Sequence, residues 1–261
     1  MGEYEFVKVE KEGHLLVVTL NRPENYNALH GPAHKELHEI WDAYEADQDL
    51  WVAIITGEGD KAFCSGNDLK ATASGGDISS PPSGFGGLTS RFDREKPIIA
   101  AVNGVAMGGG MEIALSTDLI VAAPNAKFAL PEVKVGLFAA ASGVQRLTRN
   151  IGRKMAMEMI LTGRHVLPEE AKALGIVNRI SDKEGSGVME TARTLADEIL
   201  AVSPSSVRAS KRVLNEYEAM EPLAQSLDGT GKVFMELMQT EDFKEGVQAF
   251  VAKRQPEWKN K

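Results

Sequence analysis

Hydrophobic segments in the first 102 residues predict four strands. Tyr4 to Val9 and Leu15 to Leu20 are strand-like and are separated by a turn at Glu12-Gly13, which predicts a β-hairpin. The short apolar runs 51–56 and 97–102 are bounded by glycine or proline on at least one side, which is typical of buried strands.

Helical periodicity follows the hairpin and dominates the second half of the chain. Pro32 fits the first turn of a helix with one apolar face, formed by Leu37, Ile40, Trp41 and Tyr44. After short strands at 118–123 and 127–130, residues rich in Glu, Lys, Ala and Leu predict further helices across 143–150, 153–161, 169–174, 187–202, 204–220, 222–239 and 241–253. In the last of these, one apolar stripe is formed by Phe243, Val247, Phe250 and Val251.

This order of elements predicts an α/β body followed by a helical C-terminal appendage. We place the core at residues 1–200 and a helical oligomerisation region at 201–261, because the apolar helix faces there call for a neighbouring subunit. Between the early strands and the second half, the Gly, Ser and Pro content of residues 71–88 predicts a mobile, solvent-facing loop.

Composition narrows the class of protein and its partners. The 261 residues are 43% hydrophobic and 25% charged, which fits one large globular domain or one domain with an appendage. A net charge of -8 argues against nucleic acid or an anionic membrane as the main partner. The single cysteine, Cys64, excludes an internal disulfide framework, and the N-terminus lacks the pattern of a signal peptide. We therefore expect a cytoplasmic protein without a membrane anchor.

The segment Lys96 to Glu132 carries the strongest chemical signal. A buried strand leads into Gly108-Gly109-Gly110 and then into a helix-forming sequence, which presents backbone N–H groups where negative charge is favoured. We interpret it as an anion or oxyanion site. Glu112 follows the glycines and Glu132 ends a strand, so the two could share acid–base work if the fold brings them together. The alternatives are a helix-dipole charge and a solvated turn residue.

Other chemistries have weaker support. The glycines lack the order of a dinucleotide-binding or P-loop motif, and no G-x-S-x-G or H-E-x-x-H motif is present. His30, His34 and His38 are spaced by four residues; we favour an exposed polar helix face over a metal site, because no recognised ligand set is complete. Cys64 beside Phe63 fits a small packed residue better than a nucleophile.

Several ordered segments together resemble the enoyl-CoA hydratase/isomerase (crotonase) superfamily. They are residues 62–70 (AFCSGNDLK), 96–104 (KPIIAAVNG), 108–112 (GGGME), 128–132 (FALPE), 145–147 (QRL), 161–164 (LTGR) and 249–254 (AFVAKR). The resemblance implies a crotonase-like spiral of ββα repeats with a helical C-terminal trimerisation region. It also implies an acyl-CoA thioester substrate, assembly as trimers or dimers of trimers, and no cofactor beyond the coenzyme A of the substrate.

By position in this resemblance, the N–H groups of Asn67 and Gly109 form an oxyanion hole for the thioester oxygen. Glu112 activates the attacking water and Glu132 delivers a proton to C2. Superfamily isomerases need only the carboxylate matching Glu132, so the presence of both favours a hydratase. Further residues expected near substrate or CoA are Lys61, Ala62, Cys64, Ser65, Asp68, Leu69, Lys70, Ala140 and, from a neighbouring subunit, Phe250 and Lys253.

Two features of the sequence leave the identity of the substrate undecided. Many hydratases have a proline and paired glycines where this chain has residues 136–143 (GLFAAASG), which suggests an altered acyl pocket. Residues 67–71, 86–88, 175–179 and 256–259 are similar to carnitinyl-CoA dehydratases, although that subgroup often has an aromatic residue at the position of Asn67. An isomerase and a catalytically silent CoA-binding protein remain alternatives.

Overall fold

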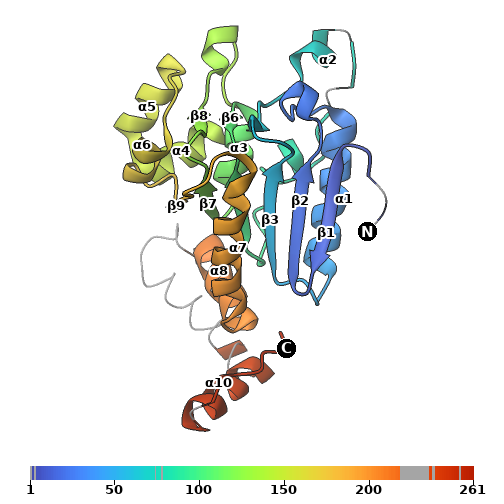
Figure 1. The fold of residues 1–261 in the computed structure, drawn as a ribbon, viewed down its shortest axis with the longest axis vertical. Coiled ribbons are helices and arrows are strands. Elements are labelled where there is room, and N and C mark those ends of the chain that lie inside the picture. The colour runs from blue at the N-terminus through green and yellow to red at the C-terminus, as the bar shows by residue number, and fades with distance from the viewer. Residues whose placement is uncertain are drawn as a thin grey trace.

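Two β-sheets form the centre of the protein (Figure 1). The computed structural model describes residues 2, 4–73, 75–77, 79–217, 235, 236, 239–252 and 254–261. The larger sheet has the order β1-β2-β3-β5-β7-β9, and only the β1–β2 pair is antiparallel. Its strands are β1 (Val7–Glu12), β2 (Leu15–Leu20), β3 (Val52–Gly57), β5 (Ile98–Val102), β7 (Leu119–Ala122) and β9 (Arg179–Ile180).

A smaller parallel sheet contains β4 (Ala62–Cys64), β6 (Val105–Met107) and β8 (Lys127–Ala129). Successive strands alternate between the two sheets: β3 is followed by β4, β5 by β6 and β7 by β8. Helix α2 (Leu69–Ala73) follows the first of these pairs, α3 (Gly109–Ser116) the second, and η3 (Glu132–Val135) with α4 (Gly143–Ile151) the third. Each turn of the chain therefore adds one layer, which confirms the predicted spiral of ββα repeats.

The larger sheet is covered on both faces, which explains its continuous apolar strands. On one face, Leu15, Val17 and Ile54 pack with the apolar stripe of α7 (Val188–Leu200). On the other, α1 (Gly31–Ala46) buries its predicted face. The two polar groups on that face also have hydrogen-bond partners: Tyr44 Oη donates to Pro97 O at 2.8 Å, and Trp41 Nε1 donates to Gly86 O at 3.1 Å.

The remaining described helices lie towards the C-terminus. They are α5 (Arg153–Thr162), α6 (Pro168–Ala173), α8 (Pro204–Tyr217) and α10 (Glu241–Ala252), with short 3-10 helices η1 (Pro23–Asn25), η2 (Phe85–Gly87) and η4 (Gly185–Gly187). Figure 1 places α10 at the end of the molecule opposite α2. Most of the helix expected at 222–239 lies outside the described residues, and the domain boundary near residue 200 stays a prediction. Within the described ranges, no helix has the length and hydrophobicity needed to span a bilayer.

Three expectations about local structure were wrong. The first strand is β1, shifted from the predicted 4–9 because its register is set by pairing with β2. The end of the 71–88 loop is not solvent-facing, since residues 86–88 are buried against α1 and α3. His34 is buried rather than exposed, and its Nδ1 accepts a hydrogen bond from Gly86 N at 3.0 Å.

Candidate active site

The start of α3 is held tightly against the smaller sheet. Gly108 has φ +54°, a conformation that suits glycine, and its N–H donates to Ala129 O at 3.0 Å. At Gly110, an added Cβ would lie 2.0 Å from Cys64 O. Because no side chain fits in that space, the glycines bring the helix N-terminus directly onto the end of β4.

The two predicted oxyanion residues lie on neighbouring segments at this point. A Cβ built on Gly66 would lie 3.1 Å from Gly109 N, so the end of β4 touches the first turn of α3. Leu29 holds the adjoining loop: its N–H donates to Gly66 O at 2.9 Å and its carbonyl accepts from Asp68 N at 2.8 Å. Asn67 is therefore fixed beside Gly109, whose N–H lies at the end of α3 that favours negative charge.

Glu112 is buried in the first turn of α3, as predicted, with 3% of its surface exposed. Its Oε1 accepts a hydrogen bond from Gly143 N at 2.8 Å, and an added Cβ on Gly143 would lie 2.9 Å from the same oxygen. Burial raises the pKa of Glu112 to about 7; the N–H groups of Gly143 and Ala141 oppose this shift, and the charge of Glu132 adds to it.

Glu132 follows Pro131 and begins η3, at the exit of β8. Its Oε1 lies 3.1 Å from the position of a Cβ on Gly108. The other oxygen, Oε2, is buried and has no hydrogen-bond partner among the described residues. Burial raises the pKa of Glu132.

The structure therefore brings the two glutamates to the same helix start, beside Gly108 and Gly109. Carboxyl groups withdrawn from solvent that repel each other can keep one proton near neutral pH, so one can act as acid while the other acts as base. The alternatives of a dipole charge and a solvated turn do not describe them, because Glu112 is 3% exposed, Glu132 is half-buried, and Oε2 of Glu132 is buried and unpaired among the described residues.

The loop after β4 is held in place by the side chain of Asp68. Asp68 pairs with Arg22 at 2.9 Å and accepts hydrogen bonds from the N–H groups of Lys70 and Ala71, which begin α2. Asp68 thus orients the loop that carries Asn67. Of the other residues expected near CoA, Lys61, Leu69 and Lys70 are exposed, Ser65 is half-buried, and Ala62 is buried.

Cys64 is a packed residue, as expected. It is fully buried, and burial raises the pKa of its thiol to about 12, so the thiol stays protonated at neutral pH. Ala140 is exposed beside a separate cavity, described below. The Phe250 backbone belongs to α10, while its side chain and Lys253 lie outside the described part of the chain, so their proposed approach to a neighbour's CoA stays a prediction.

Sequence reasoning missed the groups that position the catalytic candidates. The N–H groups of Gly143 and Ala141 orient Glu112, and Phe85 packs its ring against the backbone of Gly109, where an added Cβ would lie 2.4 Å from the ring. The unusual sequence of residues 136–143 could have indicated the contacts of Gly143 and Ala141 with Glu112. Nothing in the composition of the 71–88 loop indicated that Phe85 packs against Gly109.

These features define an α/β protein of stacked ββα repeats with two carboxyl groups at an oxyanion-type helix start. The enoyl-CoA hydratase/isomerase family model matches residues 10–261. The chain belongs to this family.

The similarity to named relatives covers nearly the whole chain. The mevalonyl-coenzyme A hydratase of Beauveria bassiana is 44% identical, covering 95% of this chain and 92% of the relative. The carnitinyl-CoA dehydratase of Citrobacter koseri is 41% identical, with 96% and 97% covered. Among solved structures, an enoyl-CoA hydratase from Mycobacterium tuberculosis has a TM-score of 0.92 at 38% identity, covering 98% of this chain and 99% of that one.

Proposed function

We propose that the protein is an enoyl-CoA hydratase that adds water reversibly across the 2,3-double bond of an acyl-CoA thioester. The coarser class is that of its named relatives: it is a hydro-lyase, and its substrates are CoA thioesters. The observation that carries the finer proposal is the pair of carboxyl groups with raised pKa at the start of α3, on the buried Glu112 and the half-buried Glu132.

In the proposed reaction, the thioester oxygen accepts hydrogen bonds from the backbone N–H groups of Asn67 and Gly109. Carboxylate Glu112 removes a proton from water as its oxygen bonds to C3, and the π electrons move towards the thioester oxygen to form an enolate. Glu132 then delivers a proton to C2. Dehydration reverses each step, and the chemistry needs no metal or separate cofactor.

Stabilising the enolate contributes most when the donors are fixed before the reaction begins. The contacts of Gly66, Gly110 and Leu29 support this, because they hold both donor segments through contacts within the protein itself. An isomerase would use Glu132 alone and would not require Glu112 to be oriented by Gly143. A carnitinyl-CoA dehydratase would use the same two glutamates, so it differs only in the acyl pocket.

A substrate panel tests the proposal. Crotonyl-CoA should lose its conjugated absorbance in the presence of the protein, and treatment with a chelator should leave the rate unchanged. Isomerisation of a 3-enoyl-CoA without hydration would favour the isomerase. Binding of CoA thioesters without turnover of any panel member would favour the silent CoA-binding alternative and overturn the proposal.

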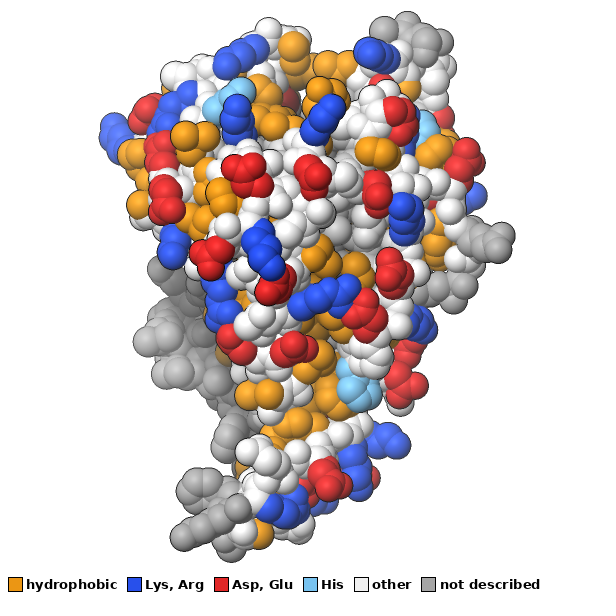
Figure 2. Space-filling view, in the orientation of Figure 1, with side chains coloured by type: hydrophobic (Ala, Val, Ile, Leu, Met, Phe, Trp, Pro, Cys, Tyr) orange, Lys and Arg blue, Asp and Glu red, His pale blue; other side chains and the backbone are white. Residues whose placement is uncertain are grey.

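We expect the protein to assemble as a trimer or a dimer of trimers. An apolar groove of about 500 Å³ runs between α7 and α8, and its apolar lining includes Leu119, Leu195, Ile199, Val202, Val207 and Leu214. Apolar side chains also gather on the lower part of the face in Figure 2, where Figure 1 places these helices. Light scattering should give a mass of three or six chains; a monomer at micromolar concentration would contradict the expectation.

A further inference from the structure

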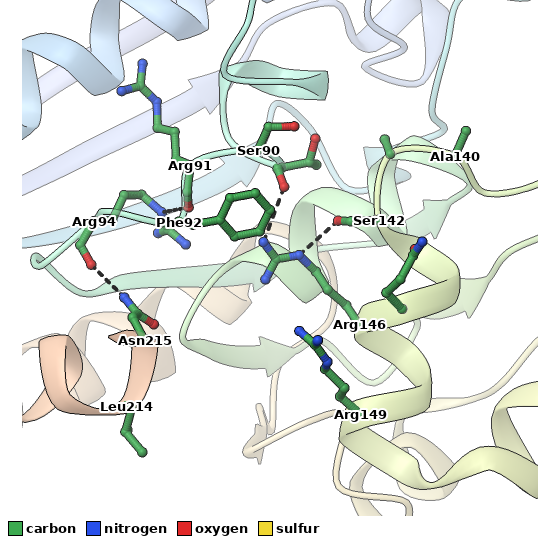
Figure 3. Close-up of a pocket in the computed structure, with 13 residues that line it drawn as sticks. Ser90, Arg91, Phe92, Arg94, Ala140, Ser142, Arg146, Arg149, Leu214 and Asn215 are labelled. Atoms are coloured by element: carbon green, nitrogen blue, oxygen red, sulfur yellow. Dashed lines mark hydrogen bonds between the residues drawn. The ribbon is translucent and has the colours of Figure 1, made fainter. Parts of the chain in front are cut away.

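A second cavity lies behind the turn that orients Glu112. It has a volume of about 890 Å³ and is bordered by residues 89–92, Arg94, the 140–142 turn, α4 and the end of α8 (Figure 3). This size is typical of small-molecule sites. Four arginines line it, namely Arg91, Arg94, Arg146 and Arg149, and no acidic side chain is among the described residues that do.

Two of these arginines are engaged with the surrounding protein. Arg91 pairs with Asp42 at 2.6 Å and points away from the cavity in Figure 3. The Arg94 side chain is 7% exposed and donates to Ser116 O, but its Nη1 has no hydrogen-bond partner in the part of the chain that is described. Its nearest carboxylate oxygen is on Asp118 at 4.0 Å, and Lys211 already holds that oxygen at 2.8 Å. Positive charge at Arg94 is therefore incompletely balanced.

The other two arginines present charge at the cavity. Arg146 donates through Nε to Ser142 Oγ at 2.9 Å and through Nη2 to Thr89 O at 3.3 Å, both neutral acceptors. Its guanidinium lies 5.6 Å from the centre of the exposed Phe92 ring. Burial, followed by the charges of Arg94 and Arg149, lowers the pKa of Arg146. A bound anion would relieve this repulsion.

The 140–143 turn joins this cavity to the candidate active site. On one side, Gly143 N donates to Glu112; on the other, Ser142 accepts from Arg146. The side chains that the turn presents to the cavity are small, namely those of Ala140, Ala141 and Ser142. An acyl chain that has its reacting carbons at Glu112 and passes this turn would bring its far end to the arginines.

We propose that this arginine pocket binds an anionic group, a carboxylate, at the far end of the substrate's acyl chain. The inference rests on the proposed hydratase function and specifies its substrate class. Arginine recognises carboxylates through paired N–H donors, and Arg146 and Arg149 lie one helical turn apart on α4. A trimethylammonium group, which aromatic side chains recognise, does not fit a pocket of like charge.

The test compares acyl chains of equal length that differ in terminal charge. For the wild type, kcat/KM for glutaconyl-CoA should exceed that for neutral 2-pentenoyl-CoA by about 10-fold or more, and 4-trimethylammonio-crotonyl-CoA should be the poorest of the three. The double variant Arg146→Gln/Arg149→Gln should lower the glutaconyl-to-pentenoyl ratio by about 10- to 100-fold. Arg153→Gln, an exposed arginine that is outside the pocket, should leave the ratio unchanged.

Binding provides a readout that does not depend on turnover. Calorimetry should show glutaryl-CoA binding more tightly than pentanoyl-CoA, and the double variant should remove the difference while circular dichroism shows an intact fold. Equal binding of the two saturated thioesters would contradict carboxylate binding in the arginine pocket, and so would a glutaconyl-to-pentenoyl ratio of kcat/KM that the double variant leaves unchanged. In either case, hydration of pentenoyl-CoA by the wild type would still support the proposed hydratase function. Equally strong, arginine-dependent binding of free glutarate would instead assign the pocket to a free anion and also overturn the proposal.

Discussion

Glu132→Gln is expected to lower kcat for crotonyl-CoA hydration by about 10²- to 10⁴-fold, the usual contribution of a positioned acid or base. The amide keeps the shape of the side chain but cannot give a proton to C2. Glu112→Gln should cause a loss of similar size, because the amide cannot take a proton from water. The exposed Glu169, on α6, provides the control, and Glu169→Gln should retain full activity. Hydration that survives Glu112→Gln would exclude the two-carboxylate mechanism.

The pH dependence follows from the same pair. Hydration needs Glu112 ionised, and its pKa of about 7 predicts a rate that rises through pH 7. It also needs Glu132 protonated, so the rate should fall as the pH rises past the raised pKa of Glu132. The result is a bell-shaped profile that belongs to the coupled pair. In Glu132→Gln the rising limb should shift to lower pH, because one contribution to the raised pKa of Glu112 is gone.

The thermal stability of Glu112→Gln, compared with that of the wild type at two pH values, tests the raised pKa of Glu112 and shows whether the variant folds. Because the pKa of Glu112 is higher in the folded than in the unfolded chain, the unfolded state loses its proton first, and stability falls as the pH rises from about 4.5 to 7. Glu112→Gln can still accept from Gly143 N and carries no charge. Its thermal midpoint should therefore exceed that of the wild type at pH 8 and match it at pH 4.

Gly110→Ala is expected to reduce kcat by about 10²- to 10³-fold, the cost of losing an oxyanion donor. The new methyl group would lie 2.0 Å from Cys64 O, a backbone atom, so α3 must move away from β4. This separates Gly109 from Asn67. Overpacking of this kind should also cost about 1–3 kcal/mol of stability, measured by urea unfolding.

A variant on the same helix separates lost stability from lost geometry. Ser116 is the last residue of α3; its Oγ donates to the backbone carbonyl of Glu112 at 2.7 Å, and Ser116→Ala removes this bond without touching the Glu112 side chain or the N–H groups of the glycines. It should lower stability while leaving the helix start, and therefore kcat, nearly intact. Unchanged kcat in Gly110→Ala would show that the start of α3 does not form the oxyanion hole.

Local patterns predicted the elements of the fold well where one face of an element is continuously apolar. The β2 strand and the buried face of α1 agree residue by residue, and Glu112 lies in the first helical turn as expected. Predictions failed where a distant segment supplies the partner. His34 looked like part of a polar helix face, but the η2 segment covers it and Gly86 donates to its ring.

The segment 96–132 shows how far the chain alone determines the site. Its order of strand, three glycines, helix and second glutamate requires a helix N-terminus with exposed N–H groups, because that follows from backbone geometry. Its resemblance to one family assigned the roles of Glu112 and Glu132. The apolar neighbours of both glutamates in the sequence already favoured raised pKa values, but their actual burial, the contact with Gly143 and the arginine pocket behind Ser142 came only from the tertiary structure. Burial, and charges on segments far apart in sequence, depend on how the ββα layers stack, and no local pattern carries that information.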